Sequence, residues 1–265
     1  MKTFMKSLAI ACLAITGSFI TTSCDEEDKP TPPIIEEPEV VVTDFQPNIV
    51  VMNFTGQLCA ACGYKQKNII PVIKADANLS KHILFASIHG NERYSELLFN
   101  EQAKEYLIAK KVNSFPHILF NNTGEVKRLL DDEISEAMKA RRAIKTEVKA
   151  KYNEADKSIE VTVKAKKIKD GGEIKAKKFR VLIWVLENGI VGNQEFIGKE
   201  HVHNSIFRGY VGNNIWGQPY ELIKEYKYKG SMPKTVSKPS NCEVLAIILD
   251  DDTKEFIDAE RALLK

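Results

Sequence analysis

The segment Asn48-Ile49-Val50-Val51-Met52-Asn53-Phe54 leads, over four residues, into Cys59-Ala60-Ala61-Cys62. The apolar run predicts a buried strand, and the residues after it predict an amphipathic helix that begins at the cysteine pair. A two-residue gap at a helix start places both sulfurs on one turn, where unpaired backbone N–H groups stabilise a thiolate at the first cysteine. This arrangement suits thiol–disulfide exchange, but the same spacing also fits half of a zinc site or a structural staple.

The N-terminus has the pattern of a secretion signal. Lys2 and Lys6 precede an apolar stretch from Leu8 to Ile20, which is too short to span a bilayer. The following Thr21-Thr22-Ser23-Cys24 resembles the lipobox of bacterial lipoproteins, where the signal is cut before a cysteine that then carries the lipid. We therefore expect a signal peptide over residues 1–23 and lipidation of Cys24. Ordinary signal cleavage, with Cys24 unmodified, is the alternative.

Residues 24–45 are acidic and rich in proline, and they start with Asp25-Glu26-Glu27-Asp28 after the cysteine. Such a composition cannot bury enough apolar area to fold, so we expect an extended tether that holds a soluble body off a membrane. The acidic run resembles the signal that sends some Gram-negative lipoproteins to the cell surface. An Asp directly after the lipidated cysteine instead retains lipoproteins in the inner membrane of enteric bacteria, and a merely solvated linker is the third interpretation.

Length and charge limit the remaining possibilities. The chain has 265 residues, 43% of them hydrophobic, and a formal net charge of +2. About 220 residues follow the signal and the tether, which is enough for two ordinary domains. The balanced charge gives no electrostatic reason to expect a nucleic-acid partner. In Ser158–Lys166 apolar and polar residues alternate, which predicts a half-buried strand that shows its lysines to water.

Two different patterns follow one another along the chain. Strands alternate with helices at first, with strands expected at 49–54, 83–88, 114–120 and 126–130, and helices at 60–77 (kinked at Pro71), 94–111 and 132–142. From Lys145 onward strands dominate, including Phe179–Leu186 and Glu243–Leu249. The second pattern predicts a β-sandwich of about 120 residues.

The first pattern resembles the thioredoxin fold in the order of its elements and in a proline-led strand. Phe115-Pro116-His117-Ile118-Leu119-Phe120, followed by Gly124-Glu125-Val126, matches the proline strand, turn glycine and next strand of that family. The resemblance implies a cis Phe115–Pro116 bond that faces Cys59. It also implies that Cys59 is the nucleophile, that Cys62 closes an intramolecular disulfide, and that Pro116 exposes backbone to an extended substrate. The alternative is a proline that only starts an edge strand.

Three residues depart from the thioredoxin pattern. Leu58 stands where a tryptophan usually precedes the first cysteine, and Phe115 supplies no hydroxyl before the proline. Asn53 stands where thioredoxin has a buried aspartate, and an amide cannot take a proton from the second cysteine. His89 and His117 are the candidate replacement bases, although ordinary partly buried histidines are the simpler interpretation.

Other residues with chemical potential carry weaker signals. His201-Val202-His203, beside Glu200, has a spacing that metal sites use, but no third ligand is evident, so the sequence predicts no metal site. Cys242 begins an apolar strand and is expected to be a buried free thiol. We expect no cofactor.

The whole chain resembles the twenty-eight-kilodalton outer membrane protein family, which consists of lipoproteins of Gram-negative bacteria. The resemblance rests on the lipobox, the acidic tether, the CxxC with Phe115-Pro116, and a C-terminal β domain that carries His203-Asn204-Ser205-Ile206-Phe207-Arg208. It implies an α+β chain with a thioredoxin-like domain over 46–142 and a β-sandwich over 143–265. It places the protein in the cell envelope, lipid-anchored to the outer membrane at its periplasmic face or at the cell surface.

Three functions remain open at this point. The first is a membrane-anchored thiol–disulfide oxidoreductase that uses Cys59 and Cys62 on extracytoplasmic protein thiols and disulfides. The second is a binding or adhesion lipoprotein in which a Cys59–Cys62 disulfide only staples a loop. The third is binding of copper or another soft metal by the two cysteines. The sequence does not decide whether the chain is an enzyme.

Overall fold

A computed structural model describes residues 39–95 and 97–265, all within one compact unit, Glu37–Lys265. The predicted signal peptide, Cys24 and most of the predicted tether lie outside the described residues. Across the two described ranges, no helix has both the length and the apolar character needed to cross a bilayer.

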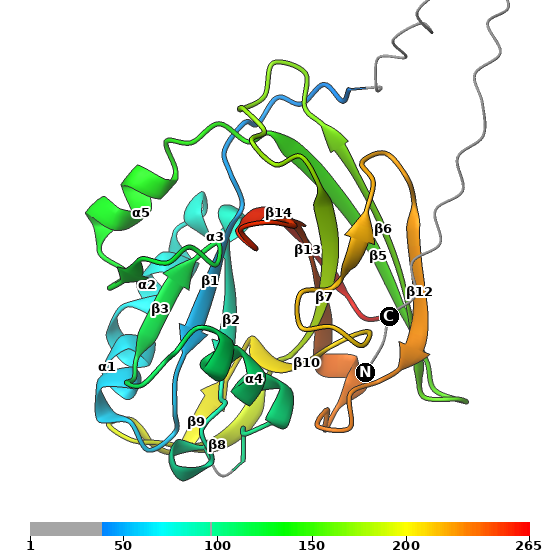
Figure 1. The fold of residues 1–265 in the computed structure, drawn as a ribbon. Helices are drawn as coiled ribbons and strands as arrows, with labels where there is room; N and C mark the ends of the chain where they lie inside the picture. Colours follow the sequence, from blue (N-terminus) through cyan, green and yellow to red (C-terminus); the bar gives the residue numbers. More distant parts are fainter. Residues whose placement is uncertain (1–38, 96) are drawn as a thin grey trace, which may run out of the picture. The chain divides into compact units, whose positions relative to one another are not determined.

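The fold is a mixed α+β arrangement dominated by sheet (Figure 1). Its helices are α1 (Ala60–Asn68), α2 (Ile70–Ala75), α3 (Leu79–His82), α4 (Glu101–Ala109) and α5 (Asp131–Ala137), with short 3-10 turns at Glu92–Tyr94 and Pro239–Asn241. The strands before residue 142 are β1 (Ile49–Phe54), β2 (Ile83–Ile88), β3 (His117–Phe120) and β4 (Val126–Lys127). The strands after it are β5 (Ile144–Asn153), β6 (Ser158–Lys167), β7 (Phe179–Glu187), β8 (Ile190–Gln194), β9 (Gly198–His203), β10 (Ile206–Tyr210), β11 (Gln218–Tyr220), β12 (Tyr226–Ser231), β13 (Cys242–Asp250) and β14 (Phe256–Leu263).

One nine-stranded sheet runs through both halves of the chain in the order β14-β13-β7-β10-β2-β1-β3-β4, with β11 added to β7. The two halves meet where β10 lies parallel to β2 and the Ser87 N–H donates to the Ser205 carbonyl at 2.7 Å. The domain boundary predicted at residue 142 therefore lies inside one compact unit, and strands from its two sides share a sheet.

Strands in the middle of this sheet are apolar at successive positions because both of their faces are covered. Val50 and Met52 of β1 face a core that includes Tyr106 of α4, whereas Ile49 and Val51 face α2 and α5. An alternating strand would leave one of these faces polar, so the continuous apolar run in β1 follows from coverage on both sides.

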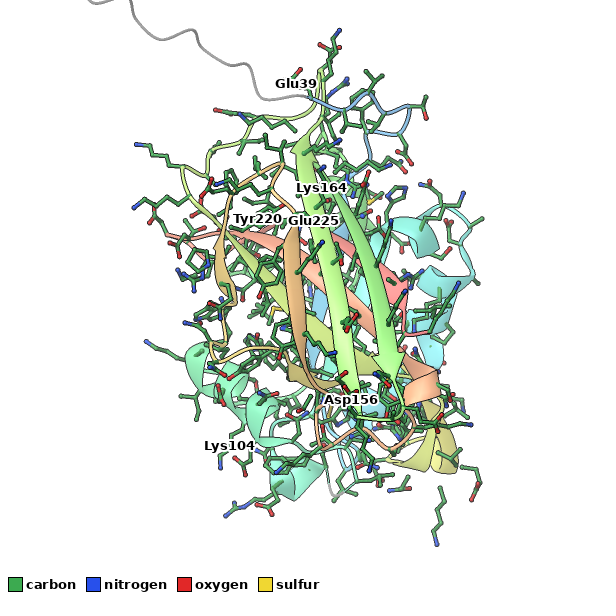
Figure 2. All side chains as sticks on the ribbon, turned by 90° about the vertical axis from the view of Figure 1, so that its right-hand side faces the viewer. Glu39, Lys104, Asp156, Lys164, Tyr220 and Glu225 are labelled. Carbon is green, nitrogen blue, oxygen red and sulfur yellow. A yellow bond between two sulfur atoms is a disulfide. The ribbon has the colours of Figure 1, made fainter. Side chains whose placement is uncertain are left out.

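The remaining strands form two small sheets, β12-β6-β5 and β8-β9. The three-stranded sheet packs on β7 and β13 through Ile159, Val161 and Val163 of β6. Its other face shows lysines to solvent, as the alternation in Ser158–Lys166 predicts; Figure 2 looks onto this face, with Lys164 labelled.

Three helices are shorter than the sequence predicts, and the residues at the ends of the first two explain why. The helix expected over 94–111 begins only at Glu101, because the extended Asn100 accepts a hydrogen bond from the Ala103 N–H and caps α4. The helix expected over 60–77 is broken at Ile69, and Pro71 lies in the first turn of α2, where proline is tolerated.

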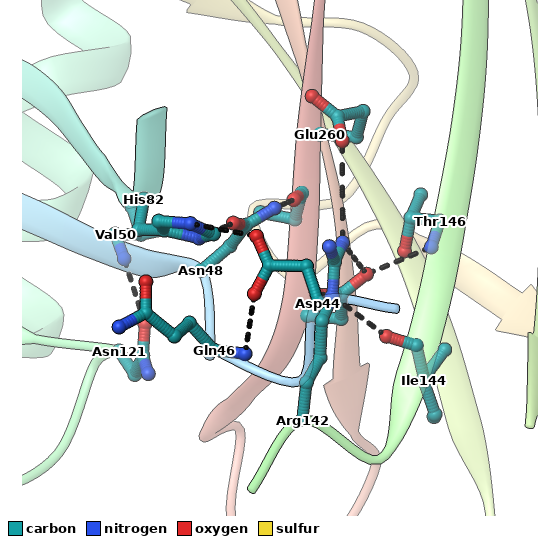
Figure 3. Close-up of polar contacts among 12 residues, drawn as sticks. Asp44, Gln46, Asn48, Val50, His82, Asn121, Arg142, Ile144, Thr146 and Glu260 are labelled. Atoms are coloured by element: carbon teal, nitrogen blue, oxygen red, sulfur yellow. Dashed lines mark hydrogen bonds and ion pairs between the residues drawn. The ribbon is translucent and has the colours of Figure 1, made fainter. Parts of the chain in front are cut away.

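The helix expected to end near Arg142 ends at Ala137, and Arg142 is instead engaged in a buried ion pair (Figure 3). Its Nε and Nη2 lie 2.7 and 2.9 Å from the two carboxylate oxygens of Asp258, which also accepts from the Thr146 N–H. Burial raises the pKa of Asp258, against the opposing effects of Arg142 and Thr146. The pair connects the start of β5 to β14.

Candidate functional site at the Cys59–Cys62 disulfide

The two cysteines lie at the end of β1 and the start of α1, as the sequence predicts. They form a disulfide with a Cα–Cα distance of 5.2 Å. Cys59 is the N-cap of α1, and its Sγ accepts a hydrogen bond from the Cys62 N–H at 3.2 Å. The first sulfur therefore faces the unpaired N–H groups of the helix, which is the local environment that lowers a thiol pKa.

Pro116 is brought to the same end of the sheet. The Phe115–Pro116 peptide bond is cis, and the strand that follows it pairs antiparallel with β1, with His117 opposite Phe54. Tyr94 connects this segment to residues 55–59, the loop between β1 and α1, which we call the cysteine loop. The Tyr94 ring lies edge-on to Phe115 with centroids 5.6 Å apart, and its carbonyl accepts from the Leu58 N–H at 3.0 Å.

A hairpin from the second half of the chain, β8–β9, lies against the cysteine loop. Backbone and side chains interlock in both directions: the Glu195 N–H donates to the Gln57 carbonyl at 2.7 Å, and Gln57 Nε2 donates to the Asn193 carbonyl at 3.0 Å. Gln194 Nε2 lies 3.2 to 3.3 Å from the carbonyl oxygens of Gly56, Gln57 and Cys59. One amide group thus lies against three carbonyl oxygens of the short loop that carries the first cysteine.

Aromatic packing extends this cover along α1. The Phe196 ring lies edge-on to Tyr64, with centroids 5.7 Å apart, and Lys67 Nζ lies 5.7 Å above the Phe196 ring. As a result Cys59 is only 8% exposed and Cys62 only 1%, while Leu58, next to them, is 44% exposed. Both cysteines are therefore buried, while their neighbours Leu58, Ala60 and Ala61 are exposed.

The candidate histidine bases do not contact the disulfide. His89 is fully buried, and its Nδ1 lies 2.8 Å from Ser95 Oγ. Burial, with the nearby His203 and Arg208, lowers the pKa of His89 to about 3. Burial, with Lys110, also lowers the pKa of His117, whose ring packs edge-on against Phe54. Both side chains are therefore held neutral at pH 7.

The His201–His203 pair does face one side of β9, with ring centroids 4.6 Å apart. Burial, together with His201, lowers the pKa of His203 to about 4, and His203 Nε2 lies 3.3 Å from the Asn193 carbonyl. Within residues 39–95 and 97–265, no group of three or more His, Cys, Asp or Glu side chains is arranged to hold a metal ion. The pair belongs to the hairpin itself, and the His203 ring packs edge-on to that of His89, with centroids 6.3 Å apart.

The segment His203–Arg208 joins the two halves of the protein. The Phe207 ring packs edge-on against Tyr106 and Trp184 in the shared core. Arg208 Nε lies 2.7 Å from Glu187 Oε2, and both side chains are buried. Burial alone would raise the pKa of Glu187, but hydrogen bonds from Ser237, Arg208 and the Lys238 N–H together lower it. These residues are structural.

Cys242 is a buried free thiol, as expected from the sequence. Burial and the nearby Glu187 raise its pKa to about 12, so its thiolate is scarce at neutral pH. Cys242 therefore offers no second reactive sulfur.

Sequence reasoning missed the residues that cover the disulfide, namely Gln57, Gly63 and the segment Asn193–Phe196. No local pattern marks them, because Gln194 and Cys59 are 135 residues apart in the chain. Only Gly63 could have been noticed by its residue type, since a glycine inside a helix lowers helix stability and can mark a close packing contact.

A family model identifies the family of this chain, and one solved structure shares its fold. Residues 103–265 match the family model described as outer membrane protein Omp28. The structure is similar to HBP35 of Porphyromonas gingivalis, with a TM-score of 0.68 and 15% sequence identity, over 83% of this chain and 76% of that one. A domain of the outer membrane lipoprotein Omp28 from the same organism matches with 25% identity and a TM-score of 0.34, over 47% of this chain and 89% of that one. A search of the curated proteins gave no match.

Proposed function

Since the chain belongs to the Omp28 family of outer membrane proteins, we propose that it is an outer-membrane or surface lipoprotein that acts as a binding module. Its place is the cell envelope, at the outer membrane. In this proposal Cys24 carries the lipid and no nucleic acid is bound. The predicted tether of residues 24–45 ends before Val40, whose backbone pairs with Ile168 inside the compact unit. The Cys59–Cys62 disulfide is a structural element that holds the cysteine loop in the conformation on which the β8–β9 hairpin packs.

The enclosure of the disulfide supports a structural role. A thiol–disulfide oxidoreductase must present its nucleophilic sulfur to a second protein, because exchange needs direct attack of one sulfur on another. Here Gln194 and Glu195 occupy the approach to the loop, and both sulfurs lie in buried residues. Asn53, which is buried in β1, offers no carboxylate to remove a proton from Cys62.

The finer fold assignment is part of the same proposal. We assign residues 46–142 a thioredoxin-like fold, on the parallel β1–β2 pair, the antiparallel β3 and the cis Phe115–Pro116 bond. We assign residues 143–265 a β-sandwich whose layers are β12-β6-β5 and the β7–β13 part of the large sheet.

A membrane-anchored thiol–disulfide oxidoreductase acting on extracytoplasmic protein thiols is the second candidate. One observation favours it: Cys59 caps a helix N-terminus, and the Cys62 N–H already donates to its Sγ. In this candidate Cys59 attacks, Cys62 resolves and Pro116 receives the substrate strand, but the β8–β9 hairpin has to move aside first.

Insulin reduction by the full chain, with dithiothreitol as the electron source, separates the two candidates. We expect wild type, Cys59→Ser and Cys59→Ser/Cys62→Ser to give the same uncatalysed rate. The double variant is also expected to lose about 2 kcal/mol of unfolding free energy, since a closed loop constrains the unfolded chain. Faster insulin reduction by wild type alone would replace the structural role with the redox one.

Exposure on the cell tests the surface location that a binding role at the cell surface requires. Intact cells that carry the chain with a C-terminal epitope tag are labelled by antibody before and after permeabilisation. A surface binding module is labelled in intact cells, whereas labelling only after permeabilisation would place it on the periplasmic face. Cys24→Ser should release the protein from the membrane fraction.

A further inference from the structure

A cavity of about 790 Å³ is lined by residues from the second half of the chain. Its walls are Ile174 and residues 176–179, which precede and begin β7, and residues 219–226, which connect β11 to β12. Lys167 of β6 and Asp251 also line it. Figure 2 shows two of them, Tyr220 and Glu225, near one end of β12 and β6. None of its lining residues belongs to the cysteine loop or to the β8–β9 hairpin.

The apolar part of the cavity is built around Tyr220 and flanked by Ile174, Phe179 and Tyr226. The Tyr220 hydroxyl is held by two hydrogen bonds. It accepts from the Ala165 N–H at 2.7 Å and donates to the Lys224 carbonyl at 2.8 Å. Its ring cannot turn away to close the cavity. A concave site with a rigid aromatic floor is typical of small-molecule binding.

Ile223, also in the wall, has a backbone conformation that a β-branched residue rarely adopts. Its φ is +66°, and its N–H donates to the Ala165 carbonyl at 2.7 Å, which holds the residue in place. Non-glycine residues in this region carry a conformational cost and are found preferentially at ligand clamps and other functional sites. Ile223 lies between β11 and β12, and its N–H is directed at β6.

The acidic side chains that line the cavity are all in ion pairs, whereas two lysines at its rim are in none of those found among the described residues. Each lining acid already has a cation: Glu221 pairs with Lys224 at 2.5 Å, Glu225 with Lys227 at 3.0 Å, and Asp251 with Arg180 at 3.0 Å. Lys177 and Lys178 are exposed at the rim, and the ion pairs found among the described residues include neither of them. Two ammonium groups at the rim are therefore available to bind an anion beside the apolar wall.

We propose that this cavity binds an amphiphilic anion, with an apolar body against Phe179 and Tyr226 and a phosphate or carboxylate at Lys177 and Lys178. A lysine ammonium serves as a mobile point charge for such a group, and the tyrosine and phenylalanine rings bury the body. The site goes beyond the proposed function and does not depend on whether the disulfide is structural or redox-active.

Dodecyl phosphate, below its micelle concentration, is the probe for the full chain. The readout is the rate of lysine acetylation by an N-hydroxysuccinimide ester, followed by mass spectrometry at single lysines, so that binding elsewhere in the chain does not count. We expect the probe to slow acetylation of Lys177 and Lys178 about fivefold and to leave Lys151 and Lys234 unchanged. Inorganic phosphate and dodecyl maltoside, which each carry half of the chemistry, should protect neither lysine.

Variants make the assignment specific. Because the acetylation readout is lost with these lysines, binding to the variants is measured by equilibrium dialysis of dodecyl phosphate. Lys177→Gln/Lys178→Gln should weaken binding about fivefold, whereas the matched Lys151→Gln/Lys234→Gln should not change it. Ile223→Gly removes the strained wall, and it should weaken binding while circular dichroism stays unchanged. Equal protection by inorganic phosphate, equal protection by dodecyl maltoside, or binding that survives the Lys177/Lys178 change would each overturn the proposal.

Discussion

The carbonyl oxygen of Glu195 lies where the Cβ of any larger residue at position 63 would have to stand. Gly63 directly follows Cys62 in α1, and Glu195 lies in the turn of the β8–β9 hairpin. The glycine therefore admits the hairpin to the surface of α1, and the hairpin encloses the disulfide. A glycine in a helix interior costs about 1 kcal/mol in helix propensity. The close approach of the hairpin explains why a glycine stands at position 63 despite this cost.

Gly63→Ala should separate the hairpin from α1. The new methyl group overlaps backbone, which cannot rotate away, so we expect a loss of about 1–3 kcal/mol of unfolding free energy and a disulfide that dithiothreitol reduces faster. Urea unfolding and release of thiol measure the two effects. Gly124→Ala is the matched control, because nothing lies within 4 Å of its Cβ position. Equal behaviour of the two variants would mean that the hairpin does not rest on α1.

Gln194→Glu tests the amide that holds the cysteine loop. The substitution keeps the shape but places a carboxylate against three carbonyl oxygens, so the hydrogen bonds become repulsive contacts. We expect faster hydrogen exchange in residues 190–203 and a disulfide that is reduced several times faster than in wild type. Gln66→Glu, on α1, is the control for the added charge and should leave both rates unchanged.

The Arg142–Asp258 ion pair should be far more costly to break than to replace. Arg142→Met leaves a buried carboxylate without its partner, and we expect a loss of about 3–5 kcal/mol. Arg142→Met/Asp258→Leu removes both charges and should lose less than the single variant. Urea unfolding of the two single variants and the double variant completes the cycle. A double variant less stable than Arg142→Met would contradict the buried, mutually dependent pair.

Acid should destabilise the protein through His203. Its pKa is about 4 in the folded protein, below the usual 6.5, so the unfolded chain takes up this proton first as the pH falls. The contribution of His203 to stability is complete above pH 6.5 and is lost between pH 6.5 and about pH 4. We expect His203→Gln to show a shallower loss of unfolding free energy than wild type over that interval. Parallel curves would show that His203 titrates normally in the fold.

Cys242 should resist alkylation while the reduced cysteine pair reacts. Its pKa of about 12 leaves almost no thiolate at pH 8, whereas Cys59 caps a helix N-terminus. After reduction, iodoacetamide should modify Cys59 first and Cys242 only on unfolding, as followed by peptide mass spectrometry. A rate profile of Cys59 against pH also reports its thiolate character. Rapid labelling of native Cys242 would be inconsistent with its buried position.

Several local elements could be predicted from the sequence because their signals are short-range. The apolar run at Ile49–Phe54, the cysteine pair at a helix start and the alternation in Ser158–Lys166 each specify their own strand or helix. The cis Phe115–Pro116 bond followed from the resemblance to the thioredoxin fold and is present. The helix starts were less well predicted, since Asn100 could have been read as a cap or as helix interior.

The contacts between distant segments were not predictable in the same way. Ser205 pairs with Ser87, and Gln194 holds the carbonyl of Cys59, across more than a hundred residues of intervening chain. Neither residue stands out by type or spacing. The predicted division at residue 142 could not anticipate them, because an apolar strand looks the same whether its neighbour comes from its own half of the chain or from the other.

The sequence by itself determined the central strands, that Cys59 and Cys62 lie within bonding reach, and the resemblance to the outer membrane protein family to which the chain belongs. Only the tertiary structure decided that the second half closes over this cysteine pair. The physical reason is that burial and hydrogen-bond direction depend on which surfaces meet in space. Nothing in the sequence around Cys59 indicates which distant side chain will donate a hydrogen bond to its carbonyl.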